Sequence, residues 1–187
     1  MGNRVIVLGN GPAGVEAARE AARHGSQVTL VGREPVGGRA GWHSLLPSKV
    51  MLHFCRGKNL KEPASPELIA EMTGRIHSLA ERYNGAERGE LESLDVAFAV
   101  GEGRLVDART VRIEGGDGAD ETIEADAVVV TTGSVPRFPD NLEPNGEEII
   151  APRHISHLES LPKSMVVVGG GVTGTEFAYG FNALGVE

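Results

Sequence analysis

The sequence is very poor in cysteine, with Cys55 alone among 187 residues. A chain with one cysteine forms no internal disulfide framework and no metal site built from several thiolates. His154 and His157 make an HxxH pair, but no carboxylate lies at ligand spacing. Two loop histidines are the simpler interpretation, and we expect no metal site.

Aromatic residues, basic clusters and long hydrophobic runs are also scarce. Aromatics make up 4% of the residues, and 26 acidic against 18 basic residues give a formal charge of −8. Such an acidic chain is not expected to bind nucleic acid. No apolar stretch approaches membrane-spanning length, and the first one, VIVL, is too short for a signal peptide. We therefore expect a cytoplasmic protein without a membrane or nucleic-acid partner.

Glycine, by contrast, is abundant, and its most informative use is near the N-terminus. The apolar run Arg4–Leu8 is typical of a buried parallel strand and leads into GNGPAG, residues 9–14. A helix is predicted to follow and to end at His24-Gly25, before a second strand over 27–31. A GxGxxG turn between a strand and a helix indicates a dinucleotide site. The alternative is a glycine turn in an α/β fold that binds nothing.

Each glycine of this turn has a physical reason. Gly9 permits the tight turn, Gly11 lets the backbone approach a pyrophosphate, and Gly14 lets the helix pack on the strand. The helix N-terminus supplies amide donors and positive potential.

The same pattern returns near the C-terminus. Met165–Val168 is a second apolar run, followed by GGGVTG at 169–174 and a predicted helix. Two such fingerprints predict two dinucleotide sites. The sequence stops at Glu187 after one strand and one helix of the second unit. A single βα unit cannot bury both of its faces, so we expect this tail to pack on another surface.

The middle of the chain is predicted to hold two helices and a meander. The helices cover 49–60 and 66–83, and the strands cover 95–100, TVRI, ETIEA and AVVV, the last of which is expected to be buried. The Pro-rich stretch from 135 to 146 reads as a linker. The predicted core positions of the helices are Met51, Leu52, Cys55, Leu68, Met72, Ile76, Leu79 and Tyr83.

Four ordered motifs carry a resemblance to a known family. GNGPAG, GG…PSK, VVVTTGS and LPKSMVVVGGGVTGTEFA resemble the class I pyridine nucleotide-disulfide oxidoreductases, which include dihydrolipoamide dehydrogenase and glutathione reductase. The resemblance covers the N-terminal part of a typical member. It implies an α/β fold, with a Rossmann-like FAD-binding domain and the first βα unit of a second Rossmann NAD(P)-binding domain. The implied divisions are an incomplete FAD domain at 1–150, a linker at 151–163 and an incomplete NAD(P)H domain at 164–187.

The resemblance also implies functional residues. Lys49 matches the family lysine near flavin N5, and Glu176 matches the glutamate that pairs with it. A cation there stabilises negative charge on reduced flavin, so both are predicted to be catalytic. The implied contacts to FAD and NAD(P)H are Gly9, Gly11, Pro12, Ala13, Gly14, Glu34, Gly38, Arg39, Lys49, Gly103, Thr132, Gly133, Gly169, Gly171 and Gly174.

Two departures from the family pattern stand out. Ala40 and Leu45 occupy the positions of the redox cysteines, so electrons cannot pass to a dithiol there. Trp42 and His43 either line the space of the missing sulfurs or pack ordinarily. Gly32 occupies the position of the acidic residue that binds the adenosine ribose.

The loss of that acidic residue leaves two alternatives open. Glu34 could reach back to the ribose, or Arg33 could favour a phosphate on it, although the GG…PSK frame argues for flavin. Losing a charged hydrogen bond costs about 1.5–3 kcal/mol.

The expected function is that of an FAD-dependent NAD(P)H oxidoreductase with an external, non-disulfide acceptor, either a small molecule or a protein. The alternative is a nucleotide-binding or regulatory flavoprotein-like module without turnover. The resemblance implies a homodimer for the full-length protein, and we expect the 187 residues alone to be inactive. We also expect the tail to pack on the first domain or on a second copy, away from the family position in which Glu176 meets Lys49.

Overall fold

A computed structural model describes residues 2–33, 35–115 and 120–187. Glu34, one of the predicted cofactor contacts, lies outside the described residues. The chain forms two compact units, one from residues up to 41 together with 82–136, the other from 42–81 together with 137–187.

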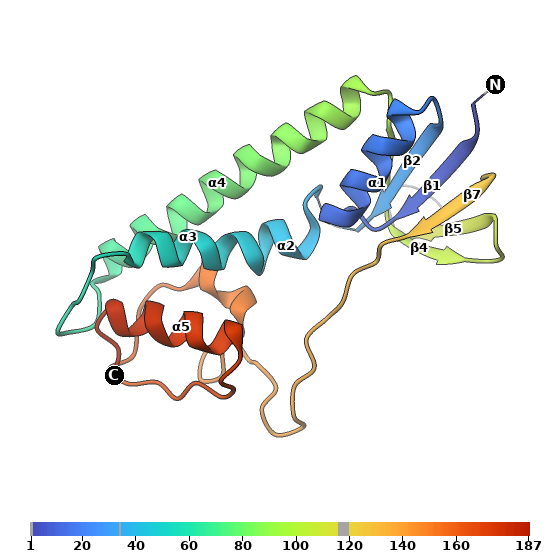
Figure 1. The fold of residues 1–187 in the computed structure, drawn as a ribbon. Helices are drawn as coiled ribbons and strands as arrows, with labels where there is room; N and C mark the ends of the chain where they lie inside the picture. The colour runs from blue at the N-terminus through green and yellow to red at the C-terminus, as the bar shows by residue number, and fades with distance from the viewer. Residues whose placement is uncertain (1, 34, 116–119) are drawn as a thin grey trace. The chain divides into compact units, whose positions relative to one another are not determined.

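The first unit is built on a four-stranded parallel sheet in the order β3-β2-β1-β7. These strands are β1 (Arg4–Leu8), β2 (Gln27–Gly32), β3 (Ala97–Val100) and β7 (Ala127–Val130). Helix α1 (Pro12–Arg23) links β1 to β2 and lies beside them in Figure 1. The strand-turn-helix-strand order predicted from the N-terminal sequence is therefore confirmed.

The sheet has a different cover on each face. An antiparallel sheet on one side has the order β4-β5-β6, from β4 (Glu102–Leu105), β5 (Thr110–Glu114) and β6 (Glu121–Glu124). Side chains of β1, β2 and β5 form the core between the two sheets. The buried members of that core are Ile6, Leu8, Val31, Val111, Ile113 and Ala125. Those on the α1 side are Val7, Val15, Ala18, Val28, Leu30, Val36, Leu91 and Val96. The parallel sheet with an antiparallel meander is thus confirmed.

Strand β7 is less buried than its apolar sequence predicts. It lies at the edge of the parallel sheet, paired on one side with β1. Val129 is 37% exposed and Val130 56% exposed. The prediction of a strand is right, and the prediction that it is buried is wrong, because β7 has one neighbour among the described strands.

The second unit packs helices around one core. Helix α3 (Leu45–Cys55) lies beside α5 (Val172–Ala183), as Figure 1 shows, and η1 (Pro152–His157) contacts α3. The N-terminal part of α4 (Pro66–Ser93) completes it. The buried side chains are Met51, Phe54, Cys55, Ala64, Ile69, Met72, Ile76, Ile155, Phe181, Ala183, Leu184 and Val186.

The two central helices differ from their predicted bounds. Helix α3 begins at Leu45 and ends at Cys55, instead of covering 49–60. Cys55 is fully buried, and desolvation raises the pKa of its thiol to about 11, which agrees with a core role. Met51 is buried, whereas Leu52 is only half-buried.

Helix α4 extends to Ser93, past the predicted end at Tyr83. The predicted stripe is also partly wrong, because Leu79 is 41% exposed and Tyr83 is 54% exposed. The buried stripe runs through Ile69, Met72, Ile76 and Ala80, spaced by three or four residues. The extension places Leu91 in the core of the first unit, which gives the helix a reason to continue.

The predicted strand at Met165–Val168 is not formed as an element, and Val166 and Val168 are exposed. The start of a parallel pairing is present nevertheless. The Met165 N–H donates to the Glu187 carbonyl at 2.8 Å, and the Glu187 N–H donates to the Lys163 carbonyl at 2.9 Å. This alternation is the pattern of a parallel ladder, so the tail begins a second strand-helix-strand unit.

His154 is a structural residue of η1. The Ala151 N–H donates to His154 Nδ1 at 3.1 Å, and Arg153 Nε lies 3.1 Å from His154 Nε2. Burial, with the charge of Arg153 and of a protonated His157, lowers the pKa of His154. In the described residues, no group of three or more His, Cys, Asp or Glu side chains could hold a metal ion.

This shift predicts a loss of stability on acidification. The folded state holds the His154 proton less tightly than the unfolded state, so stability rises as the pH passes through the ordinary imidazole pKa, near 6.5, and levels off above it. The free energy of unfolding of the wild type should therefore fall as the pH drops below that value. In His154→Gln this fall should be smaller. Urea unfolding at several pH values tests this, with His53→Gln, whose ring is exposed, as the control. Identical pH slopes for wild type and His154→Gln would contradict it.

Candidate dinucleotide-binding site

The first glycine turn joins β1 to α1. Gly9 has φ +103°, and its N–H donates to the Val31 carbonyl at 2.8 Å. A Cβ on Gly14 would overlap the Gly9 carbonyl oxygen and lie 2.8 Å from Thr131 Oγ1. The turn therefore requires a left-handed residue at its start and a residue without a side chain at Gly14.

Thr131 holds the turn from the neighbouring strand. Its hydroxyl lies 2.8 Å from the Leu8 carbonyl and 3.0 Å from the Gly9 carbonyl, and its N–H donates to Leu8 at 2.7 Å. The sequence prediction named Thr132 and Gly133 and missed Thr131. Thr132 does lie against the turn, because a Cβ on Gly9 would be 3.0 Å from Thr132 Cα. A hydroxyl directly after the apolar run AVVV was the available signal.

A second glycine segment packs against the same turn. The Gly37 N–H donates to the Asn10 carbonyl at 2.9 Å, and a Cβ on Gly38 would lie 2.9 Å from Gly11 Cα. Helix α2 (Gly38–Trp42) begins here, and Arg39 is its second residue. The structure therefore brings together the predicted residues Gly9, Gly11, Gly14 and Gly38.

Asn84 is the buried polar residue behind this segment. It is 2% exposed, and its amide atoms have no hydrogen-bond partner among the described residues. A Cβ on Gly41 would lie 2.5 Å from Asn84 Oδ1, and one on Gly37 would lie 3.0 Å from Nδ2. The glycines at 37 and 41 thus leave room for the Asn84 side chain. Nothing in the sequence indicated this contact.

The N-terminus of α1 fits a diphosphate. Its N-cap is Gly11 (φ −74°, ψ −177°), no side chain caps it, and the space a Gly11 side chain would fill is open to 4 Å. The first amides of a helix have no intrahelical acceptor, and the helix dipole favours an anion there. Pro12 and Ala13 are exposed in this first turn. Open backbone donors with no competing side chain are what a dinucleotide diphosphate requires.

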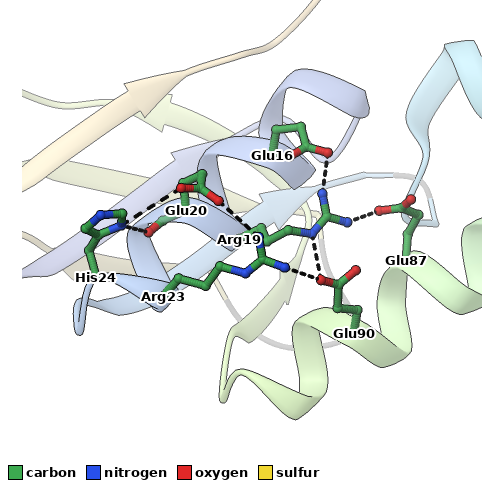
Figure 2. A network of polar contacts seen from close by, with 7 residues as sticks. All are labelled: Glu16, Arg19, Glu20, Arg23, His24, Glu87 and Glu90. Carbon is green, nitrogen blue, oxygen red and sulfur yellow. Dashed lines mark hydrogen bonds and ion pairs between the residues drawn. The ribbon is translucent and has the colours of Figure 1, made fainter.

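An ion-pair network holds α1 to the C-terminal part of α4, as Figure 2 shows. Arg19, which is 6% exposed, pairs with Glu16 of its own helix and with Glu87 of α4, and its Nε lies 3.1 Å from Glu90 Oε1. Its hydrogen bond with Glu16 raises the pKa of the guanidinium, desolvation opposes this, and Glu87 adds to the increase. The arginine therefore stays charged at every ordinary pH. Arg23 also pairs with Glu90, at 2.9 Å.

Replacing Arg19 by methionine should destabilise the protein by about 2 kcal/mol. The change leaves Glu87 and Glu90 facing α1 without their buried counter-charge. Urea unfolding measures the loss. Arg23→Met is the matched control, because that side chain is 50% exposed and should cost under about 1 kcal/mol. Equal losses in the two variants would contradict a special role for the buried arginine.

Gly103 lies in β4, away from any open space. A Cβ there would be 2.7 Å from Leu8 Cδ2 and 3.1 Å from Val31 Cγ1. Close packing of β4 on the parallel sheet explains this glycine. A contact of Gly103 with a cofactor remains a prediction.

The second glycine turn repeats the geometry of the first. Gly169 has φ +113°, and a Cβ on Gly174 would overlap the Gly169 carbonyl oxygen. Gly171 caps α5 with φ −74° and ψ −175°, and the space beside it is open. The Thr175 N–H donates to the Gly171 carbonyl at 3.0 Å, as the Val15 N–H does to Gly11 at 2.9 Å. The two fingerprints therefore form the same phosphate-type turn, one in each unit.

Lys49 and Glu176 form an ion pair between α3 and α5 in the second unit. The Lys49 side chain is 49% exposed and that of Glu176 is 26% exposed, so the ammonium remains accessible. This pair overturns the expectation that the tail packs away from its family position. The physical reason is that Phe181 and Leu184 of the tail are buried in the same core as Met51 of α3.

The two residues predicted to be catalytic thus meet in one unit, and the residues of the first glycine turn meet in the other. Ala40 lies in α2, and Leu45, 56% exposed, begins α3. Trp42 and His43 between them are half-buried.

Comparison with known proteins now identifies the family. Residues 3–187 match the family described as pyridine nucleotide-disulphide oxidoreductase. The chain belongs to this family. Its members use FAD and NAD(P)H, as the resemblance implied, and are oxidoreductases.

Several members of the family are similar over the whole chain. An NAD(P)H dehydrogenase (quinone) of Mycobacterium tuberculosis is 32% identical over 100% of this chain and 42% of its own length. A dihydrolipoyl dehydrogenase of Chlorobaculum parvum is 33% identical over 98% of this chain and 41% of its own. The crystal structure of LpdA from Mycobacterium tuberculosis superposes with a TM-score of 0.86 at 31% identity, covering 98% of this chain and 43% of that one. The chain therefore spans under half the length of the family members it matches.

Among the described helices, none combines the length and the apolar composition that a bilayer crossing requires.

Proposed function

We propose that this chain is part of an FAD-dependent NAD(P)H oxidoreductase that passes hydride from NAD(P)H to FAD and on to an external, non-disulfide acceptor. The observation that supports this most directly is the pair of glycine turns with matching caps at Gly11 and Gly171. Two turns suit two dinucleotides. We assign the first to FAD, within 1–150, and the second to NAD(P)H, from 164 onward, with 151–163 as linker.

Each part of the chain has a separate task in this proposal. The α1 amides hold the FAD diphosphate, with Gly38 and Arg39 beside them, and the α5 amides hold that of the nicotinamide nucleotide. Bound FAD supplies a group that accepts a hydride. Lys49 places a positive charge for the reduced flavin, and Glu176 fixes the direction of the ammonium. Residue 34 remains a candidate ribose contact.

The proposal of an external electron acceptor rests on the absence of the two redox cysteines from this segment. With Ala40 and Leu45 in place of cysteines, reduced flavin has no dithiol of this segment to reduce. We therefore propose an acceptor from outside, either a small molecule or a protein. A quinone is the first class to test, since the Mycobacterium tuberculosis relative is named for one. We propose a homodimer for the full-length protein, a cytoplasmic location, and no turnover by these 187 residues alone.

The test uses the full-length protein. Under anaerobic conditions, NADH or NADPH should bleach the flavin absorbance, and a quinone should restore it. Protein that binds FAD but is bleached by neither donor would favour the second candidate, a nucleotide-binding module without turnover. The observation that favours this second candidate is Gly32, which stands where the family has a carboxylate that binds the adenosine ribose. Protein that takes up no FAD would contradict the oxidoreductase and would also support the nucleotide-binding module.

A further inference from the structure

A side chain from the first glycine turn fills the space beside Gly32 at the end of β2. A Cβ on Gly32 would overlap the side-chain amide of Asn10 and lie 2.6 Å from its Oδ1. The Asn10 amide therefore occupies the space in which a side chain at position 32 would begin. Because Gly32 has no side chain, the side chain of Asn10 fits into the space beside it.

The position of this amide has a chemical meaning. In dinucleotide-binding folds, a carboxylate about 20 residues beyond the glycine turn, at the end of the second strand, accepts hydrogen bonds from the adenosine ribose hydroxyls. Gly32 lies eighteen residues after Gly14. An asparagine amide offers an acceptor oxygen and a donor nitrogen, so it can bond two hydroxyls without a charge.

The backbone of Asn10 is fixed within the turn. Its carbonyl accepts the Gly37 N–H at 2.9 Å, and it lies between Gly9 and Gly11 of the diphosphate turn. Asn10 as a whole is half-buried. A residue whose backbone is held here, and whose amide lies beside Gly32 at the end of β2, meets the requirement for ribose recognition.

The neighbouring Arg33 is a weaker candidate for the same task. It is 72% exposed and lies 3.4 Å from Glu102, which supplies a carboxylate to its guanidinium. A 2′-phosphate would have to compete with that carboxylate. The site therefore suits an unphosphorylated adenosine ribose.

We propose that the Asn10 side chain binds the adenosine ribose hydroxyls of the FAD held at the first turn, in place of the carboxylate expected at position 32. The inference rests on the proposed function, because it takes FAD as the occupant of that turn. It makes Asn10 a binding residue and makes residues 10 and 32 a pair that must be exchanged together.

The experiment measures FAD affinity on full-length apoprotein by flavin fluorescence. Asn10→Ala should weaken FAD binding about tenfold, the effect of one to two neutral hydrogen bonds. FAD with a 2′-deoxyadenosine half should bind the wild type about threefold to tenfold more weakly than FAD. Asn10→Ala should bind the two cofactors equally. Arg33→Ala is the control and should bind FAD as the wild type does.

The exchange of the two residues gives a second readout. Gly32→Glu alone should bind FAD more weakly than the double variant, because its Cβ meets the Asn10 amide and that amide has to move. Asn10→Ala combined with Gly32→Glu should recover affinity to within about threefold of the wild type, since a carboxylate then reaches the ribose. Asn10→Asp should also retain binding. Thermal melting checks that each variant is folded.

The outcomes separate this inference from the proposed function. Wild-type protein that binds no FAD defeats the proposed function and the inference with it. Wild-type protein that binds FAD, with an Asn10→Ala variant of equal affinity, defeats the inference alone. So does an Asn10→Ala variant that still discriminates against the deoxy cofactor.

Discussion

Gly14→Ala should reduce FAD affinity in the full-length protein at least 100-fold. A Cβ at this position overlaps the Gly9 carbonyl oxygen and lies 2.8 Å from Thr131 Oγ1. Neither group is free to move, because Gly9 bonds to Val31 and Thr131 bonds to Leu8 through their backbones. Helix α1 must therefore shift away from the sheet, and its N-terminal amides then no longer point at the diphosphate. Two lost charge-assisted hydrogen bonds, at about 1.5–3 kcal/mol each, account for the loss.

The measurement is a flavin fluorescence titration of apoprotein, with thermal melting beside it. Overpacking of this kind also costs about 1–3 kcal/mol in stability. Gly89→Ala is the matched control, because Gly89 lies in α4 with nothing within 4 Å of the added methyl group. It should bind FAD normally and melt no lower than the wild type. A Gly14→Ala variant with wild-type affinity would show that this turn does not hold the cofactor.

The equivalent substitution in the second glycine turn tests binding of the other dinucleotide. A Cβ on Gly174 overlaps the Gly169 carbonyl oxygen in the way that one on Gly14 overlaps Gly9. Gly174→Ala should therefore keep its FAD and lose NAD(P)H binding. Loss of FAD from Gly174→Ala with retention in Gly14→Ala would reverse the assignment of the two turns.

The turns could be predicted because their constraints are local. Gly9, Gly11 and Gly14 are set by the backbone of one strand-turn-helix segment, and that segment is continuous in sequence. Helix α1 ends at Arg23, beside the predicted stop at His24-Gly25. The antiparallel meander was equally visible, because its strands are neighbours in the chain.

The predictions are wrong where contacts between residues distant in sequence determine which side chains are buried and which strands form. The predicted stripe of α4 runs through Leu79 and Tyr83, whereas Ile76 lies in the core of the second unit and Ala80 is buried beside that stripe. The apolar run after Met165 has the composition of a strand, yet its ladder consists of the bonds with Glu187. Propensity supplied the type of element there, and pairing determined whether it formed.

The site shows the same division. Lys49 and Glu176 could be named from motifs, but only the packing of α5 on α3 shows that they meet. Thr131, Asn84 and Asn10 escaped prediction because each acts on glycines far away in sequence. A glycine at 32, 37 or 41 looks like a loss of side chain until the group that fills the space is known.

Lys49→Met should slow reduction of the flavin by NAD(P)H about 100-fold while the protein keeps its FAD. Removal of one preorganised electrostatic group from a reacting centre typically costs about 10²–10³ in rate. The structural cost should be small, because Lys49 is 49% exposed and such ion pairs contribute at most about 1 kcal/mol. A slow variant of normal stability therefore indicates a role in the reaction. Anaerobic stopped-flow absorbance measures the rate, and urea unfolding measures the stability.

Two further variants make this prediction specific. Glu176→Gln keeps the Lys49 charge and a hydrogen-bond acceptor, so it should slow reduction by less than Lys49→Met does. Lys58→Met removes another lysine of the same unit, whose ammonium lies 4.3 Å from the centre of the Phe54 ring, and should leave the rate unchanged. The flavin reduction potential should fall in Lys49→Met, because the anionic reduced flavin loses a neighbouring cation, and stay constant in Lys58→Met. Equal rates and potentials in the two lysine variants would assign the Lys49–Glu176 pair to the packing of α5 on α3 alone.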